Sequence, residues 1–285
     1  MTNELAFIDA LRALARSPVA RDLEDDCAVL ELDSETLVLT HDMMAESTHF
    51  RSDADMANVA WKLVAVNLSD LAAKGATPLG VLLGYSLGDN DARFLEGLGE
   101  VLEAFDVPLL GGDTVRAEGS RIFGLTAIGR ATHVPVPDRR RTQPGDSVWV
   151  TGVLGRAMLG FEGQAEHLAS FNRPMPCLSE GEALAPHVTS MMDISDGLLL
   201  DCWRLAKASG VSIELESSAI PVADPDRRGD CLRWGDDYEL LFTLPAGCEP
   251  PVPATMIGTV ATQGGCPLFL DGLAHTDPEG LGYRH

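Results

Sequence analysis

The chain has 285 residues, 45% of them hydrophobic, and its 43 acidic and 21 basic side chains give a formal net charge of −22. This length is sufficient for two domains with a core each. The charge disfavours nucleic acid or an anionic membrane as a partner, because both are bound through basic surfaces, and a phosphate ligand would need divalent cations to bridge it to the carboxylates.

The N-terminal residues and the cysteines indicate a cytoplasmic protein. The first 17 residues predict an amphipathic helix that contains Glu4 and Asp9, unlike a secretory signal. No apolar run reaches the ~18–20 residues that span a bilayer. The six cysteines include no C-x-x-C pair, so we expect reduced thiols and neither a zinc site nor a disulfide framework.

Short strands and longer helices alternate irregularly in the first half of the chain. The stretch Trp61–Ala76 predicts a helix that begins near Met56. A short strand over 107–110 runs into Gly111-Gly112-Asp113-Thr114, a sequence typical of turns. The other predicted elements are strands over 27–32, 36–40, 81–85 and 121–130, a turn over 33–35 and a helix over 91–105.

A proline- and arginine-rich segment, residues 132–146, marks a change in composition, and we place a domain boundary in it near residue 138. Neither half shows strict β-α-β alternation, so we expect an α/β (α+β-like) fold of two domains, residues 1–138 and 139–285. The second half predicts strands over 147–151, 211–216, 238–244, 256–260 and 267–270, helices after Gly155 and over 179–185, and one long helix over 191–210 that ends at Gly210.

The helix over Trp61–Ala76 is apolar on most faces, which indicates that it is buried. Asn67, Ser69 and Asp70 nevertheless lie in its middle. A buried carboxylate is costly unless it is paired or holds a metal. The alternative is local: Ser69 or Asn67 caps a turn, and Asp70 forms an i,i+4 ion pair with Lys74 on a solvated edge.

Aspartates recur beside apolar elements throughout the chain. Hard cations prefer oxygen ligands, and Mg²⁺ commonly joins one or two carboxylates to the phosphates of a substrate. Convergence of these acids on one place would therefore predict a site for several metal ions and a phosphoryl group. Taken singly, each acid could also be a turn or capping residue. The positions are Asp25-Asp26, Asp42, Asp70, Asp113 and Asp193/Asp196.

Four motifs carry a resemblance to a known family. They are VNLSDLAAKGA at 66–76, GGDT at 111–114, DISDG at 193–197 and GDDYELLF at 235–242, and DDCA at 25–28, HF at 49–50 and PGD at 144–146 occur in the matching order. From about Asp22 to Tyr283 the chain resembles the thiamine-monophosphate kinase family, a branch of the aminoimidazole-ribonucleotide-synthetase-like (PurM-like) ATP-binding superfamily.

The resemblance implies a two-domain PurM-like architecture, with an N-terminal mixed-sheet domain that pairs into a homodimer and an active site in the cleft between the two domains of one chain. It implies phosphorylation of thiamine monophosphate to thiamine diphosphate, with ATP as co-substrate and several Mg²⁺ ions. The implied metal-site positions are Asp26, Thr40, His41, Asp42, Asp70, Asp113, Asp193 and Asp196, of which Asp42, Asp70, Asp113 and Asp193 would be catalytic.

The same resemblance implies two further groups of residues. Gly112, Asp113, Arg139 and Ser195 would contact the nucleotide, although the register within Arg139-Arg140-Arg141 stays open. His49, Asp236 and Tyr283 would contact thiamine monophosphate. Because the acceptor is a phosphate oxygen that is already ionised, the reaction needs alignment and charge neutralisation rather than a general base.

The sequence departs from the family pattern at several of these places. The glycine-rich approach to the first acids is replaced by Asp22–Asp26, which lacks both glycines. His41 stands in place of threonine, Asp236 in place of glutamate, Trp234 in place of glycine and Tyr283 in place of tryptophan. Two alternatives follow: another ATP-dependent synthetase of the superfamily, or a non-catalytic protein that binds nucleotide or metal.

Overall fold

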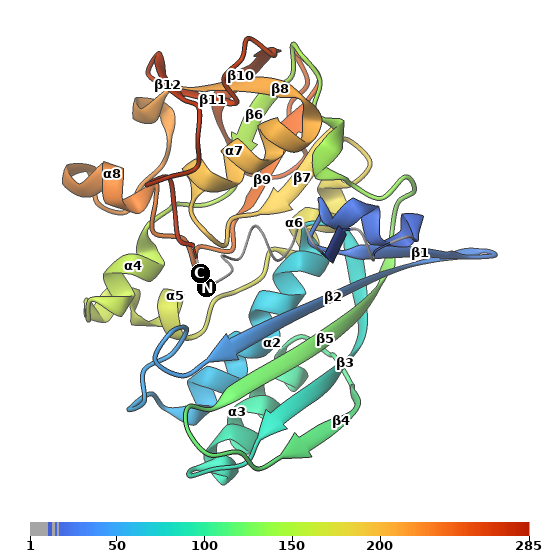
Figure 1. Cartoon of the computed structure of the whole chain (residues 1–285), viewed down its shortest axis with the longest axis vertical. Helices are drawn as coiled ribbons and strands as arrows, with labels where there is room; N and C mark the ends of the chain where they lie inside the picture. The colour runs from blue at the N-terminus through green and yellow to red at the C-terminus, as the bar shows by residue number, and fades with distance from the viewer. Residues whose placement is uncertain (1–10, 13–14, 16, 285) are drawn as a thin grey trace.

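The computed structural model describes residues 11–12, 15 and 17–284. Two sheet-containing halves lie one above the other, with helix α2 (Met56–Ala72) running from the lower half towards the junction (Figure 1). The amphipathic helix expected over residues 1–17 lies largely outside the described residues. Within the described ranges, no helix is long and apolar enough to cross a membrane.

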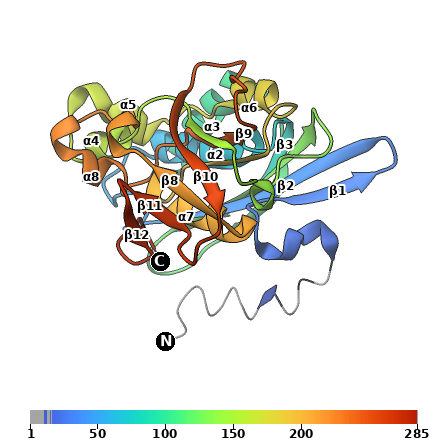
Figure 2. The same cartoon turned by 90° about the horizontal axis from the view of Figure 1, so that it is seen from above.

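The first half is built on a five-stranded mixed sheet. Its strand order is β1-β2-β5-β3-β4, with only β3 and β4 parallel. The β1–β2 hairpin extends away from the body of the molecule (Figure 2). One face of the sheet packs on α2, and α3 packs on α2 in turn. The bounds are β1 Ala28–Leu32, β2 Glu35–Ala45, β3 Ala76–Ser86, β4 Leu109–Val115, β5 Ile122–Ala131 and α3 Asp91–Ala104.

Helix α2 is buried on every side, as its apolar composition predicts. The Asp55 carboxylate caps it by accepting a hydrogen bond from the Ala57 amide. The helix contacts α3 and the first sheet, and from the second half it contacts α5 (Leu168–Asn172), α6 (Leu178–Leu184) and β7 (Ser190–Asp193). Its polar residues therefore face protein and not bulk water, so each of them needs a protein partner or a ligand.

The second half is built on a seven-stranded mixed sheet in the order β12-β11-β8-β10-β6-β9-β7. Only the pair β8–β11 is parallel. The strands are β6 Ser147–Val150, β7 Ser190–Asp193, β8 Val211–Leu215, β9 Leu240–Leu244, β10 Thr255–Thr262, β11 Leu268–Leu270 and β12 Leu273–His275. The helices are α4 Arg156–Phe161, α5 Leu168–Asn172, α6 Leu178–Leu184, α7 Leu198–Ser209 and α8 Arg228–Cys231.

Two predicted elements are wrong in detail. The long helix predicted over 191–210 is a strand, β7, followed by a turn and the shorter helix α7, which ends at Gly210 as expected. The predicted turn at Gly111–Thr114 belongs to strand β4. A fully buried four-residue strand shows no alternation of apolar and polar residues, so its sequence resembles that of a buried helix.

The two halves meet closely where α6 lies against the C-terminal end of α2. A Cβ added to Gly181 would lie 2.0 Å from the Ala72 carbonyl oxygen, and one added to Gly75 would lie 2.3 Å from the Ala185 Cβ. The last strand of the first sheet ends at Ala131, and the first strand of the second begins at Ser147. The boundary near residue 138 stays a prediction, and it falls in this connecting segment.

Candidate active site

The polar residues of α2 have partners from both halves of the molecule. The Ser69 hydroxyl donates to the Asp193 carboxylate at the end of β7, at 2.6 Å. The Thr40 hydroxyl of β2 donates to the Asp70 carboxylate. Because all four side chains are buried, these contacts bring β2 and β7 to the same point on the helix.

Three carboxylates from three elements meet at this point. Oxygen atoms of Asp26, Asp70 and Asp193 all lie within 4.8 Å of one another. Burial raises the pKa of Asp70 well above its usual value, and repulsion from Asp42 and Asp193 adds to the effect. Burial and repulsion from Asp26 raise the pKa of Asp193 to about 7. A hard cation would remove this repulsion, so the carboxylates fit Mg²⁺.

Asp42 borders the same group. Its main-chain amide donates to the Asn67 side chain at 2.9 Å, which anchors β2 on α2. Burial raises the pKa of Asp42 to about 6, and repulsion from Asp26 and Asp196 contributes. The structure therefore brings five of the six aspartates predicted as metal-site positions into one acidic region.

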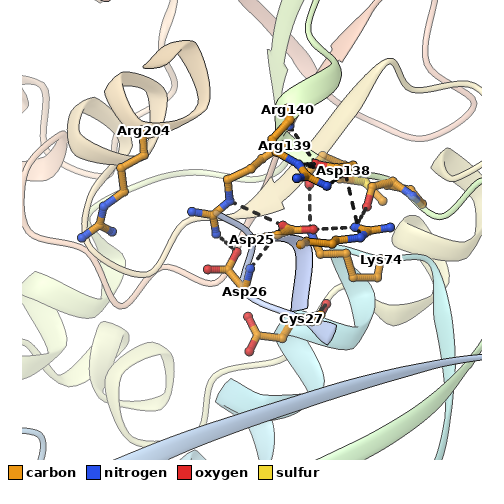
Figure 3. Close-up of polar contacts among 12 residues, drawn as sticks. Asp25, Asp26, Cys27, Lys74, Asp138, Arg139, Arg140 and Arg204 are labelled. Carbon is orange, nitrogen blue, oxygen red and sulfur yellow. Dashed lines mark hydrogen bonds and ion pairs between the residues drawn. The ribbon is translucent and has the colours of Figure 1, made fainter. Parts of the chain in front are cut away.

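The alternative ion pair between Asp70 and Lys74 is wrong. Lys74 is fully buried, and its ammonium donates to Asp25 at 2.6 Å. Asp25 also pairs with Arg139 (Figure 3) and with Arg21. Burial alone would raise the pKa of Asp25, but Lys74, Arg139 and Arg21 outweigh it and lower the pKa to about 2. Asp25 therefore already has protein counterions, and a metal ion is not needed to neutralise it.

Arg139 is the member of the arginine run that faces the acids. It is 8% exposed and contacts both Asp25 and Asp26. Arg140 points instead to Asp138 and Asp22. A metal ion on Asp26 would compete with the Arg139 guanidinium for this carboxylate.

Three expected residues are not joined to the acidic region within one chain. The register aligns Met43 of β2 with Asp113 of β4 across β5 and β3, and three strand spacings of ~4.8 Å put them roughly 14 Å apart. Gly112 lies on the same edge strand. The His41 imidazole hydrogen-bonds Thr126 on the outer face of the sheet, so at most its main-chain carbonyl could serve the site.

A cleft of about 570 Å³ lies beside the carboxylates and is lined by both halves. The three residues predicted to contact thiamine monophosphate, His49, Asp236 and Tyr283, all line it, as does Ser195. The His49 Nδ1 accepts a hydrogen bond from the Ala45 amide at 3.0 Å, which orients the ring.

The same cleft contains residues that the sequence did not single out. The Lys62 ammonium bonds Asp236 at 2.6 Å and lies 4.0 Å from the centre of the Phe171 ring. Phe161 packs between Phe171 and Trp234, with ring centres 5.3 and 5.1 Å away. The sequence could have pointed to Lys62, because it is one of only three lysines and the only basic residue in the first four turns of an apolar helix.

The DISDG motif forms the turn between β7 and α7. Gly197 has φ 108, and a Cβ there would lie 2.7 Å from the Arg233 carbonyl oxygen, so glycine is required. The turn places Ser195 and Asp196 in the cleft lining. Fully buried Asp201 accepts a hydrogen bond from the Asp196 amide at 3.2 Å. Neither Asp201 nor its neighbour Arg204 was predicted.

Comparisons with known proteins agree with this architecture. The family model of the AIR synthase related protein N-terminal domain matches residues 24–131, and that of the AIR synthase related protein C-terminal domain matches residues 143–266. The fold is thus that of a two-domain protein of this class, which confirms the expected pair of PurM-like domains.

Curated relatives show which family within this class the chain resembles. Thiamine-monophosphate kinase of Salmonella typhimurium is 34% identical, over 97% of this chain and 90% of the relative. Thiamine-monophosphate kinase of Aquifex aeolicus is 30% identical, over 98% of this chain and 97% of the relative. The chain belongs to the thiamine-monophosphate kinase family.

Solved structures give the same answer. AaThiL complexed with AMPPCP and TMP matches with a TM-score of 0.89 and 28% identity, covering 99% of this chain and 97% of that one. Thiamine-monophosphate kinase from Stenotrophomonas maltophilia matches with a TM-score of 0.77 and 31% identity, covering 95% and 96%. The predicted family and fold class are both confirmed.

Proposed function

We propose that the protein transfers the terminal phosphoryl group of ATP to the phosphate of thiamine monophosphate, forming thiamine diphosphate and ADP. The main observation is that the carboxylates of both halves converge beside a cleft that both halves line. Membership of the thiamine-monophosphate kinase family, with one solved relative complexed with AMPPCP and TMP, supports the choice of substrates.

We further propose that Asp26, Asp70 and Asp193 hold Mg²⁺, with Asp42 and Asp196 at the margin of the group. Their oxygen atoms are the donors that Mg²⁺ prefers. The ion would neutralise charge on the transferring phosphoryl group. The chain itself aligns the reactants, because α2 fixes strands of both halves around one point, and the acceptor phosphate oxygen needs no general base.

The aromatic end of the cleft suits the thiamine part of the acceptor. Thiamine carries a positively charged thiazolium ring, and cations bind favourably over aromatic faces and beside carboxylates. Phe161, Trp234 and Tyr283 offer such faces, and Asp236 adds a carboxylate held by Lys62. This arrangement positions the acceptor with its phosphate towards the acidic region.

Gly112 and Asp113 fit the proposal through a second copy of the chain. The outer face of the first sheet exposes apolar side chains, among them Leu82 at 39% and Ile122 at 47%. We propose that this face pairs with itself in a homodimer. A two-fold axis along the strands would set β4 of one copy over β2 of the other, so the partner's Gly112 and Asp113 would lie over the strand that carries Asp42.

Replacement of Leu82 by arginine tests the dimer. The wild-type protein should sediment at twice the 30.4 kDa of one chain, and the variant should sediment as a monomer with reduced turnover. Leu95→Arg is the matched control, because Leu95 is 63% exposed on α3, away from the sheet face. A monomeric wild-type protein that is fully active would contradict the pairing.

A direct assay tests the activity. The protein is incubated with ATP, Mg²⁺ and thiamine monophosphate, and thiamine diphosphate and ADP are quantified with EDTA as control. We expect one diphosphate per ADP and no product with EDTA. ADP without thiamine diphosphate would indicate another acceptor of the superfamily, and Mg²⁺-dependent ATP binding without turnover would indicate a non-catalytic binder.

A further inference from the structure

Helix α7 carries an acidic and a basic residue, Asp201 and Arg204, that together hold Asp196. The Arg204 Nη1 lies 2.5 Å from the Asp196 carboxylate and 3.1 Å from Asp201. The second oxygen of Asp201 accepts the Asp196 amide. Because Asp201 is fully buried, it fixes both the turn that carries Asp196 and the direction of the Arg204 side chain.

Arg204 differs from the other arginine of this region in its access to the cleft. It lines the cleft together with Asp26 and Asp42, and its side chain is 30% exposed. In Figure 3 it projects from α7, apart from the network that surrounds Asp25. The Arg139 guanidinium, in contrast, is nearly buried between Asp25 and Asp26.

The guanidinium has hydrogen-bond donors to offer. Both carboxylate contacts use Nη1, and within the described part of the chain Nε and Nη2 have no hydrogen-bond partner. The other basic residues of the cleft lining are engaged elsewhere: Lys62 bonds Asp236, and Arg51 bonds the exposed Asp53. Guanidinium groups bind phosphate through paired N–H donors in a fixed plane.

We propose that Arg204 is a substrate-binding residue whose free donors hold a phosphate of the reactants in the cleft, while Asp196 and Asp201 keep its side chain in place. The shared chemistry is a phosphate ester, which either thiamine monophosphate or ATP supplies. The inference rests on the proposed function. It adds a positive charge that the chain itself holds in place, beside carboxylates that otherwise repel a phosphate.

The experiment compares thiamine with thiamine monophosphate, which differ only in the phosphate, and adds AMPPCP as the second phosphate ligand. Binding of thiamine monophosphate, thiamine and AMPPCP in Mg²⁺ is measured by titration calorimetry for the wild-type protein, Arg204→Gln and Arg204→Lys. Loss of a charge-assisted hydrogen bond predicts roughly tenfold to hundredfold weaker binding by Arg204→Gln. The loss should affect thiamine monophosphate or AMPPCP but not thiamine, and Arg204→Lys should recover part of it.

Which ligand loses affinity identifies the phosphate. Arg227→Gln is the matched control, because Arg227 also pairs with two acids, Glu162 and Asp230, but lies outside the cleft lining. Equal losses for thiamine and its phosphate would show a structural role and overturn the proposal, as would unchanged binding of both phosphates. A wild-type protein that binds neither phosphate ligand would overturn the proposed function itself.

Discussion

Asp25 and Asp26 are neighbours in sequence and share Arg139, but the rest of their surroundings differs. Asp25 is buried among Lys74, Arg21 and Arg139, and these cations hold its pKa at about 2. Asp26 lies beside Asp70 and Asp193, whose pKa values are raised. Asp26 shares Arg139 with Asp25, but Asp70 and Asp193 form no ion pair within the described residues, so the chain leaves most of this group for ligands to neutralise.

The different surroundings of Asp25 and Asp26 indicate a structural role for the first residue and a ligand-binding role for the second, although both lie in one loop. A buried charge that is fully paired can hold two segments together, and removal of one partner is strongly destabilising. Buried carboxylates that form no ion pair within the described residues, as Asp70 and Asp193, repel one another, and a bound cation relieves this repulsion. Substitutions on the two sides should therefore have different consequences, the first for stability and the second for ligand binding and turnover.

The largest expected effect is on turnover, in Asp70→Asn. Loss of a metal ligand should cost several kcal/mol of transition-state stabilisation, or about a thousandfold in kcat. The variant should remain folded and be at least as stable as the wild-type protein in EDTA, because it relieves repulsion. Product assays and thermal melts with and without Mg²⁺ measure both. An unfolded variant would show that Asp70 is structural.

The next effect is on stability, in Lys74→Met. Removal of the buried ammonium leaves Asp25 with two of its three cations and should cost about 3 kcal/mol of unfolding free energy. Urea denaturation measures it. Lys207→Met is the control, because Lys207 is exposed and lies over the Trp203 ring, and it should change stability by less than ~1 kcal/mol. Equal effects of the two variants would refute the distinction.

A third buried carboxylate sharpens the comparison through pH. Asp237 accepts the Gly155 amide at one oxygen, the other has no partner among the described residues, and burial raises its pKa well above the usual value. The neutral form is thus favoured in the folded state. The stability that the protein gains from keeping this carboxyl neutral is complete below the pKa of Asp237 in the unfolded chain, ~4. This gain is lost as pH rises towards the pKa of Asp237 in the folded protein.

Asp237→Asn removes this dependence. As pH rises above the unfolded pKa, the wild-type protein should lose stability relative to the variant, by up to about 1.4 kcal/mol per pH unit for as long as the folded carboxyl keeps its proton, because one proton is then released on unfolding. Urea denaturation of both proteins at several pH values measures the difference. Parallel stability curves would mean that Asp237 is already ionised in the folded protein.

The smallest effect is expected for an exposed ion pair. Arg93 pairs with Asp55 at 2.7 Å, but both side chains are at least 40% exposed. Arg93→Gln should therefore change the unfolding free energy by less than ~1 kcal/mol, and the change should vanish in high salt. Thermal melts at low and high ionic strength measure it. If Arg93→Gln lost as much unfolding free energy as Lys74→Met, burial would not determine how much an ion pair contributes to stability.

The sequence predicted the fold class and most of the site, but not the partners of the charged groups. Apolar runs and turn residues located most strands, and the motifs located the acids that converge. The partner of Lys74 could not be predicted, because Asp70 is four residues away on the same helix whereas Asp25 reaches Lys74 only through the tertiary fold. Strand β7 was missed because its four residues are all buried.

The sequence could not predict the separation of Asp113 from Asp42, because this too depends on the tertiary fold. Both residues belong to motifs that carry the family resemblance, and a motif does not say which strand of a sheet lies beside which. The strand order puts β5 and β3 between β2 and β4. Only the pairing register reveals that a single chain does not bring the two aspartates together.

The glycines at the junction of α2 and α6 govern how the cleft can open. At this end Gly181 lies against the Ala72 carbonyl and Gly75 against the Ala185 methyl group, so the two halves are in close contact there. Near α5 the halves are joined by side chains: Trp61 bonds the Pro174 carbonyl, and Arg173 bonds Asn58. A rotation about the glycine contact as a pivot would therefore widen the cleft at the aromatic end and would move the carboxylates near the pivot least.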